Sequence, residues 1–180
     1  MKQPLTEQIQ EVASLLTLLQ VKIVFAESCT GGLISASLAR APGISDVHCG
    51  SAVVYRLDTK SQWLGVPAPM LLEPGPVSQL VAEAMATGVL ERTPEADIAA
   101  SITGHLGPNA PDSQDGLVFV GIAIRGKTCR VTEHRLPKFL CEVGNFPYPG
   151  DTEREQRQWQ AVTIVLDAIA KALREEFLSF

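Results

Sequence analysis

The segment KIVFAESCTGGLISASLARAPG, residues 22–43, contains the transition that decides the fold. Residues 21–26 are mostly apolar and rich in β-branched residues, which predicts a buried strand. Small or acidic residues occupy positions 27–32, and a helical pattern then runs from Leu33 to a Pro-Gly breaker. The chain therefore changes from buried strand to helix across one carboxylate, two hydroxyls and one thiol.

The same alternation of strands and helices continues along the chain. Further strands are predicted at residues 49–55, 96–104, 117–124 and 128–136, and helices at 6–20, 33–40, 58–64, 77–90 and 154–177. Thr6 and Asp58 are the predicted N-caps of two of these helices. The last two strands flank Gly126, which predicts a hairpin. This order predicts an α/β fold, a single three-layer α/β/α domain with a mixed β-sheet over residues 1–180.

The composition narrows the classes of function. The 180 residues carry a net charge of −5 without a basic block, so no nucleic-acid partner is expected. No apolar stretch reaches the roughly 20 residues that span a bilayer, and the N-terminus has no signal-peptide core, so a cytoplasmic protein without membrane contact is expected. The four cysteines, Cys29, Cys49, Cys129 and Cys141, match no zinc spacing, which predicts free thiols and no metal site.

Polar residues follow three of the predicted strands. They occupy residues 27–32, 55–60 and 103–108. Ligands of open α/β sheets bind at the carboxyl ends of the strands, so the three clusters are expected to converge on one site.

The first cluster offers several chemistries. Backbone N–H groups of Thr30, Gly31 and Gly32 would open the helix and could hold an anion, with the two glycines allowing close approach. Ser28 at the bend is a candidate nucleophile, whereas the simpler reading makes Ser28 or Thr30 an N-cap. Cys29 is a rival nucleophile, because a helix N-terminus lowers the pKa of a thiol. The segment is neither a Walker A loop nor a G-x-S-x-G elbow.

A serine nucleophile needs a base, and two candidates remain open. His105 lies at a predicted strand end, although a lone loop histidine is commonly structural. Lys60 can act as a base if burial lowers its pKa, and otherwise it is a surface lysine. Tyr55 is either a proton relay or a half-buried tyrosine of the sheet.

Four motifs together resemble one protein family. The motifs are AESCTGG at residues 26–32, PGxS at 42–45, Tyr55 followed by Lys60, and TGxxGP at 103–108. They are similar to the C-terminal domain of the competence/damage-inducible protein CinA, many members of which are nicotinamide-nucleotide amidases. The resemblance implies hydrolysis of the carboxamide of nicotinamide mononucleotide to nicotinic acid mononucleotide and ammonia.

The resemblance also implies roles for individual residues. Ser28 would be the nucleophile, Lys60 its base and Tyr55 an assistant of this Ser-Lys pair. Thr103, with its neighbour Gly104, would help to bind the nucleotide, a small-molecule substrate. No cofactor is needed, and a homo-oligomer is expected.

The chain departs from the family pattern in two places. Residues 109–116, NAPDSQDG, replace a glycine-rich run, and their Asp112 and Asp115 would repel an anionic nucleotide if they faced the site. At residues 150–157, GDTEREQR, Thr152 stands where the family has arginine, unless Arg154 takes that role in substrate binding. These departures keep open the alternative of a paralogue that binds a nucleotide-like ligand without this turnover or acts on another amide. A third alternative, a cysteine-dependent hydrolase or redox protein, rests on Cys29.

Overall fold

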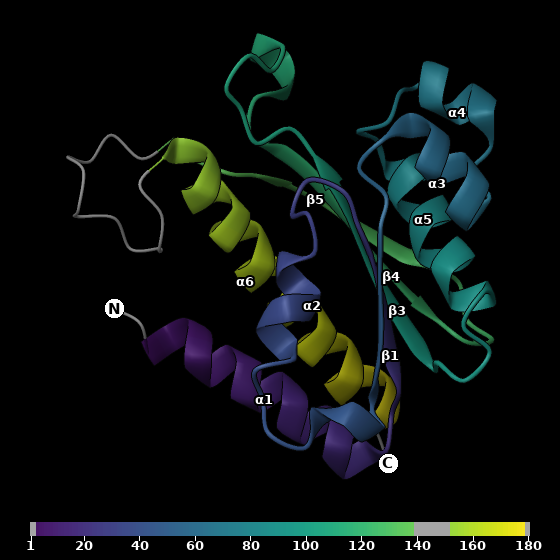
Figure 1. Cartoon of the computed structure of the whole chain (residues 1–180), viewed down its shortest axis with the longest axis vertical. Coiled ribbons are helices and arrows are strands. Elements are labelled where there is room, and N and C mark those ends of the chain that lie inside the picture. Colours follow the sequence, from purple (N-terminus) through teal and green to yellow (C-terminus); the bar gives the residue numbers. More distant parts are fainter. Residues whose placement is uncertain (1–2, 139–151, 179–180) are drawn as a thin grey trace.

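The computed structural model describes residues 3–138 and 152–178, whose strands form one five-stranded sheet (Figure 1). The strands are β1 (Ile23–Glu27), β2 (His48–Val53), β3 (Ile98–Gly104), β4 (Leu117–Ile124) and β5 (Arg130–Arg135), in the order β2-β1-β3-β4-β5. Strand β1 is parallel to both β2 and β3, whereas β4 is antiparallel to β3 and to β5. The predicted α/β fold with a mixed sheet is confirmed.

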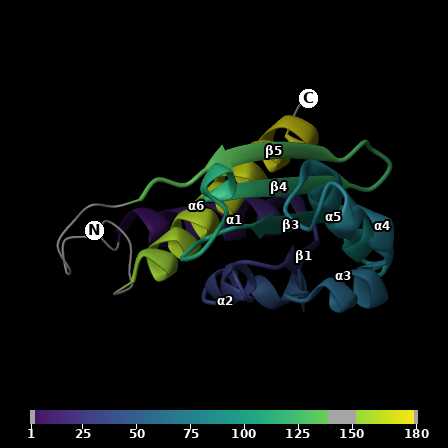
Figure 2. The same ribbon diagram turned by 90° about the horizontal axis from the view of Figure 1, so that it is seen from above.

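Helices cover both faces of the sheet (Figure 2). One face carries α1 (Gln3–Leu19), α2 (Leu33–Leu38) and α6 (Glu153–Phe177), and the other carries α3 (Leu57–Leu64), α4 (Ala68–Leu72) and α5 (Gln79–Glu91). Two short 3-10 helices, Ile44–Asp46 and Asp112–Gln114, lie in loops. No described helix combines the length and the apolar character that a membrane span requires.

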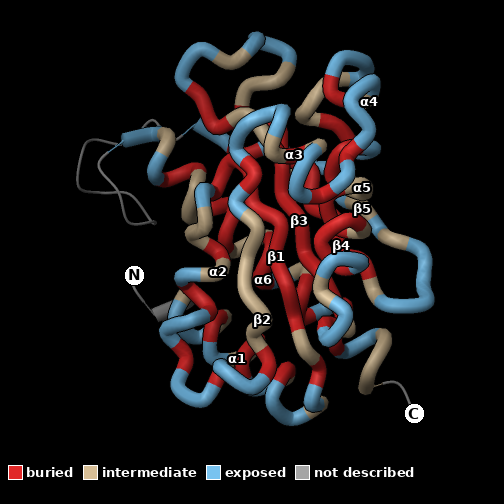
Figure 3. The backbone as a smooth tube through the Cα atoms, turned by 45° about the vertical axis from the view of Figure 1, so that its right-hand side comes forward, coloured by how far each residue is buried: buried red, intermediate tan, exposed pale blue. Residues whose placement is uncertain are grey.

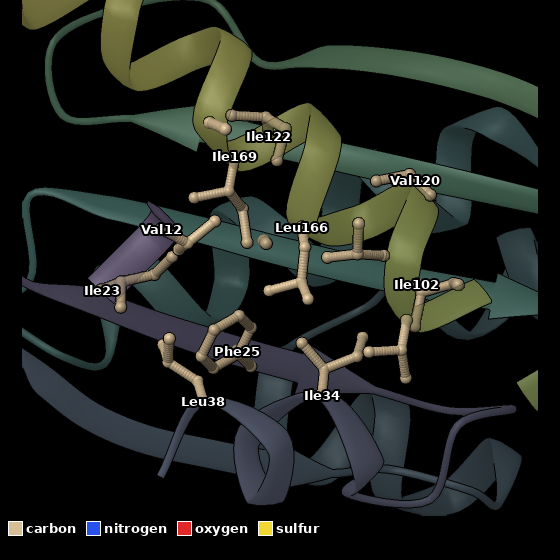
Figure 4. Packing of buried hydrophobic residues seen from close by; sticks show 14 of the residues in the cluster. Val12, Ile23, Phe25, Ile34, Leu38, Ile102, Val120, Ile122, Leu166 and Ile169 are labelled. Atoms are coloured by element: carbon tan, nitrogen blue, oxygen red, sulfur yellow. The ribbon is translucent and has the colours of Figure 1, made fainter. Parts of the chain in front are cut away.

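The alternation of side chains along β1 divides the core between the two faces. Phe25 belongs to the larger core cluster, and Figure 4 shows it among Leu38 of α2 and Leu166 of α6. Its neighbours Val24 and Ala26 belong to the second cluster, under α5. Successive side chains of a strand point to opposite faces, so a continuous apolar run indicates a strand that is buried on both sides.

The face beneath α5 is built from small residues, which lets the helix approach the sheet closely. A Cβ added at Gly121 of β4 would lie 2.8 Å from the carbonyl oxygen of Ala82 in α5. A Cβ added at Gly88 of α5 would lie 2.1 Å from the carbonyl oxygen of Leu64 in α3. The α3–α5 layer is thus fixed tightly to the sheet, and α3 is the helix that carries Lys60.

Burial is deepest in the middle of the sheet (Figure 3). All residues of β1 are buried, while β2 forms an edge of the sheet and is only half-buried along most of its length. The carboxyl ends of the parallel strands β1, β2 and β3 meet at the same edge of the fold. Residues that follow these strands are therefore brought together next to a sheet edge.

Some local predictions were wrong. Thr6 lies inside α1 and is no N-cap, and Asp58 lies in the first turn of α3, whose N-cap is Arg56. Helix α4 was not predicted, because a five-residue helix with an early proline shows too little periodicity to be recognised. Cys141 and Gly150 lie outside the described residues.

The larger core cluster predicts a stability difference between two leucines. Leu166 of α6 is fully buried, whereas Leu18 of α1 is 74% exposed. We expect Leu166→Ala to lower the free energy of unfolding by about 2–5 kcal/mol, because it removes buried apolar surface and leaves a cavity. Leu18→Ala should change it by less than about 0.5 kcal/mol. Urea denaturation followed by circular dichroism measures both, and equal effects would contradict the assignment of the core.

Candidate active site

A cavity of about 240 Å³ opens at the carboxyl ends of β1, β2 and β3. Its lining comes from the residues after β1, the start of α3, the loop after β3, and α6. The structure thus brings together the three polar clusters expected to converge, with Ser28 from the first, Tyr55 and Lys60 from the second, and Thr103 from the third. Within residues 3–138 and 152–178, none of those that line the cavity is Asp or Glu.

Ser28 and Lys60 are in direct contact. Lys60 Nζ donates to Ser28 Oγ at 2.8 Å and to the carbonyl oxygen of Val54 at 2.6 Å. Lys60 is 1% exposed, and burial lowers the pKa of its ammonium group to about 8. A lysine with this pKa is partly neutral near pH 8, so it can accept a proton from the serine hydroxyl.

The position of Lys60 follows from the pairing of two strands. The backbone N–H of Val54 donates to the carbonyl of Glu27, which extends the β1–β2 pairing beyond the end of β2. The chain then enters α3, in which Lys60 lies in the second turn and returns over the end of β1. The carbonyl of Val54 is one of the two acceptors for the amine of Lys60.

The carboxylate of Glu27 occupies the N-terminus of α2. Glu27 is fully buried, and its two oxygens accept hydrogen bonds from five donors in the following turn, α2 and β2. The donors are Thr30 Oγ1, Ser51 Oγ of β2, and the backbone N–H groups of Gly32, Ile34 and Ser35. A negative charge here satisfies N–H groups that have no partner within the helix and complements its dipole. The carboxylate itself is therefore the cap of α2.

Thr30, Gly31 and Gly32 do not line the cavity. The Thr30 hydroxyl and the Gly32 N–H are engaged by Glu27, and the Gly31 N–H donates to the carbonyl of Ser28. The protein's own carboxylate thus lies where the anion of a ligand was expected, and a role of these residues in substrate binding stays a prediction. Gly31 and Gly32 allow the turn between β1 and α2, because both adopt a positive φ, 63° and 99°, which glycine tolerates without strain.

Cys29 has a buried thiol that ionises less readily than an ordinary cysteine. It is 3% exposed, and burial raises the pKa of its thiol to about 12. Its carbonyl accepts a hydrogen bond from Gln158 Nε2 of α6 at 3.2 Å, which ties the turn to that helix. Its backbone N–H donates to no other described residue, and Cys29 lines the cavity.

Arg154 and Tyr55 meet at the cavity. Arg154 donates from Nη2 to the Tyr55 hydroxyl at 2.7 Å and from Nη1 to the carbonyl of Gly107 at 2.5 Å. Tyr55 is 57% exposed and lies beyond the end of β2, so it is no half-buried sheet tyrosine. Thr152, the other candidate for the role of arginine, is instead the N-cap of α6 in a capping box with Glu155.

The loop after β3 supplies one wall of the cavity, from Thr103 and Gly104 to Ala110. The Thr103 hydroxyl donates to the carbonyl of Pro76 at 2.7 Å, so it is committed to joining this wall to the segment before α5. His105 also lines the cavity, but within the described residues no hydrogen bond joins it to Ser28. Of the two candidate bases, Lys60 is the one in contact.

The acidic residues of this loop do not face the cavity. Asp115 instead forms ion pairs with Arg157 and Lys138. Arg157 and Gln158 were not predicted as site residues. Arg157 lies four residues before Ala161 and eight before Val165, so it belongs to the buried stripe of the helix. A charged residue at such a position needs a buried partner, and this spacing is the sequence signal by which Arg157 could have been found. In the part of the chain that is described, no three His, Cys, Asp or Glu side chains group as metal ligands.

Comparison with known proteins adds a family relationship. The model of the CinA C-terminal domain matches residues 5–142. A CinA-like protein of Citrifermentans bemidjiense is 34% identical over 150 residues, 82% of this chain, and one of Prochlorococcus marinus is 44% identical over 110 residues, 61% of it. The alignments cover only 33% and 26% of these relatives, so the chain matches about a third or less of their length.

Solved structures share the fold over almost the whole chain. The competence/damage inducible protein CihA from Agrobacterium tumefaciens has 30% identity and a TM-score of 0.81, with 94% of this chain and 95% of that chain covered. The CinA superfamily protein KP700603 from Klebsiella pneumoniae has 27% identity and a TM-score of 0.81, covering 96% and 99%.

The burial of Cys29 predicts an unreactive thiol. With a pKa of about 12, about one thiol in ten thousand is ionised at pH 8, and only the thiolate is alkylated. We expect iodoacetamide to leave Cys29 unmodified in the folded protein and to modify it in urea, as followed by peptide mass spectrometry. Cys49, which is half-buried, provides the comparison and should react first. Equal rates in the folded protein would contradict the geometry.

Proposed function

The chain belongs to the CinA C-terminal domain family, and we propose that it is a nicotinamide-nucleotide amidase that uses a Ser-Lys mechanism. The reaction would convert nicotinamide mononucleotide and water into nicotinic acid mononucleotide and ammonia. The observation that carries the proposal is the 2.8 Å contact between Lys60 Nζ and Ser28 Oγ in a buried position that opens into a cavity.

In the first half of the reaction, neutral Lys60 accepts the proton of the Ser28 hydroxyl while Oγ bonds to the carboxamide carbon. The resulting tetrahedral intermediate carries a negative oxygen. When it collapses, the Lys60 ammonium returns the proton to the departing nitrogen, which leaves as ammonia. The product of this half is an ester between Ser28 and the nicotinoyl group.

In the second half, a water molecule hydrolyses this ester. Neutral Lys60 takes a proton from the water as its oxygen attacks the acyl carbon, and then returns a proton to Ser28 Oγ as the ester bond breaks. The acid product leaves, and the serine and the lysine return to their starting states. Both halves use the same pair, so a single base with a pKa of about 8 serves acylation and deacylation.

The backbone N–H of Cys29 is the donor that we assign to the developing oxyanion. It belongs to the residue that follows Ser28, and Cys29 lines the cavity. This N–H donates to no other described residue, whereas the N–H of Ser28 itself donates to the carbonyl of Ile102 in β3. A fixed donor aimed at the oxygen that becomes charged stabilises the transition state more than the ground state.

The charge of the cavity supports an anionic substrate. Arg154 lines it, and its two hydrogen bonds to Tyr55 and Gly107 hold the guanidinium in place. Among the described residues none that lines the cavity carries a carboxylate, so on these walls the guanidinium is free to meet a phosphate group. Apolar side chains such as Leu57 and Val77 complete the lining and suit an aromatic ring.

The alternative of a paralogue that binds a nucleotide without hydrolysis was motivated by the acidic loop and by Thr152. Asp115 does not line the cavity but pairs with Arg157, and Arg154 supplies the cation that Thr152 lacks. Both departures are thus compatible with a cavity that accepts an anion, which favours the amidase. The proposal also includes a homo-oligomer without nucleic-acid or membrane partners and a cytoplasmic location, all of which stay predictions.

Replacing the proposed nucleophile gives the first test of function. We expect purified wild-type protein to release ammonia from nicotinamide mononucleotide and Ser28→Ala to lose at least about 1,000-fold of this rate, because no covalent intermediate can form. Cys29→Ala should keep the rate within about threefold, since the buried thiol takes no part. Loss of activity in Cys29→Ala alone would favour the cysteine mechanism. Tight binding of the mononucleotide without ammonia release would favour the paralogue.

The pKa of Lys60 predicts the pH dependence. The base must be neutral, and the neutral fraction rises with pH, so kcat/KM should increase about tenfold per pH unit below pH 8 and level off above it. A pH profile of ammonia release from pH 6 to 10 measures this. Lys60→Arg should abolish the reaction, because a guanidinium stays charged over this range. A rate that is flat or falls between pH 6 and 8 would rule out Lys60 as the base.

A further inference from the structure

The first turns of α6 hold the loop at residues 104–116, which forms one wall of the cavity. Arg154 donates to the carbonyl of Gly107. Arg157, one helical turn later, is 1% exposed and forms two parallel hydrogen bonds with Asp115, from Nη1 to Oδ1 at 2.8 Å and from Nη2 to Oδ2 at 3.1 Å. Its Nη1 also lies 2.9 Å from Glu153 Oε1. The buried guanidinium is therefore neutralised by two carboxylates, one of them from the loop.

The two ends of the loop are built around this guanidinium. A Cβ added at Gly107 would lie 3.0 Å from Arg157 Nη1, and one added at Gly116 would lie 3.4 Å from Arg157 Nη2. Both glycines have a positive φ, 66° and 72°. Arg157 thus packs against the backbone at the start and at the end of the same loop, in space that larger side chains would fill.

The loop residues that line the cavity differ from the loop residue that binds Arg157. Residues 107–110 line the cavity, whereas Asp115 does not. The Arg157 guanidinium, with Lys138 on the solvent side, holds the pKa of Asp115 well below its usual range, so the carboxylate stays ionised and paired. The carbonyl of Asp115 also accepts a hydrogen bond from Arg135.

We propose that Arg157 is a positioning residue for the substrate site: through Asp115 it fixes the loop at residues 107–115 and, with it, the Gly107 carbonyl that orients Arg154. This inference rests on the proposed function, because its effect is read as affinity for the nucleotide. The Ser28–Lys60 contact is built from the ends of β1 and β2 and from α3, and it involves no atom of the loop. Loss of the anchor therefore changes substrate binding and leaves the reacting groups in place.

The variant Asp115→Asn removes the ionic pair at small risk to folding. Arg157 keeps Glu153 as a partner, so no unpaired charge is buried. Lys138→Met is the matched control, because it removes the other cation on the same carboxylate, at 2.9 Å, from a side chain that is 60% exposed. Arg157→Lys is the conservative variant, since an ammonium keeps the charge but cannot form both parallel bonds.

The test is steady-state ammonia release from nicotinamide mononucleotide, beside hydrolysis of p-nitrophenyl acetate. We expect Asp115→Asn to raise KM for the mononucleotide about tenfold with kcat within about threefold, Arg157→Lys to show a smaller rise, and Lys138→Met to match wild type. The small ester needs Ser28 and Lys60 but carries no phosphate for Arg154 to bind, so its hydrolysis should stay within about twofold in all variants. An unchanged KM in Asp115→Asn overturns the proposal, as does an equal loss on both substrates, which would indicate general loosening.

Hydrogen exchange separates a failure of this inference from a failure of the proposed function. If wild-type protein releases no ammonia from the mononucleotide, the amidase proposal fails, and the anchor is judged by exchange alone. Faster exchange of the amides at residues 107–116 in Asp115→Asn, without change in β1 or α3, supports the anchor. Unchanged exchange in this loop overturns it.

Discussion

The structure depends on one buried anion, the carboxylate of Glu27. A buried charge is tolerated only with strong partners, and a helix that starts in the interior needs an acceptor for its first N–H groups. Glu27 satisfies both demands at once, since five donors from the following turn, α2 and β2 converge on it. This contact fixes the path of the turn. Successive side chains of an extended chain point to opposite sides, and the side chain of Ser28, the next residue, lines the cavity.

The same contact explains how a lysine can be a base beside an acidic residue. A carboxylate close to Lys60 would favour its charged form, but the charge of Glu27 is directed toward hydrogen-bond donors of α2 and β2. Lys60 has a hydroxyl and a carbonyl as hydrogen-bond partners, both neutral, and burial then lowers its pKa. Glu27 and Lys60 are therefore both buried, and each has its own set of hydrogen-bond partners.

How far the sequence predicts this arrangement depends on the range of the interactions. The buried strand before Glu27 and the hairpin at Gly126 follow from local patterns, and the convergence of the polar clusters follows from the geometry of parallel strands. The cap of α2 was missed because its acceptor precedes the helix by six residues, outside the usual N-cap position. The pairing of Asp115 with Arg157 joins residues far apart in the chain, so a net repulsion was expected where the structure has neutralisation.

The half-buried strand β2 has a consequence for local stability. The carbonyl of Val54, which follows β2, accepts a hydrogen bond from Lys60, and the chain enters α3 directly after this outermost strand of the sheet. Edge elements open more readily than the middle of a sheet, as separate cooperative units. When this edge opens, water reaches the amine and its proton affinity returns to that of an ordinary lysine. On heating, activity would then be lost at a temperature at which β1, β3 and β4 are still folded.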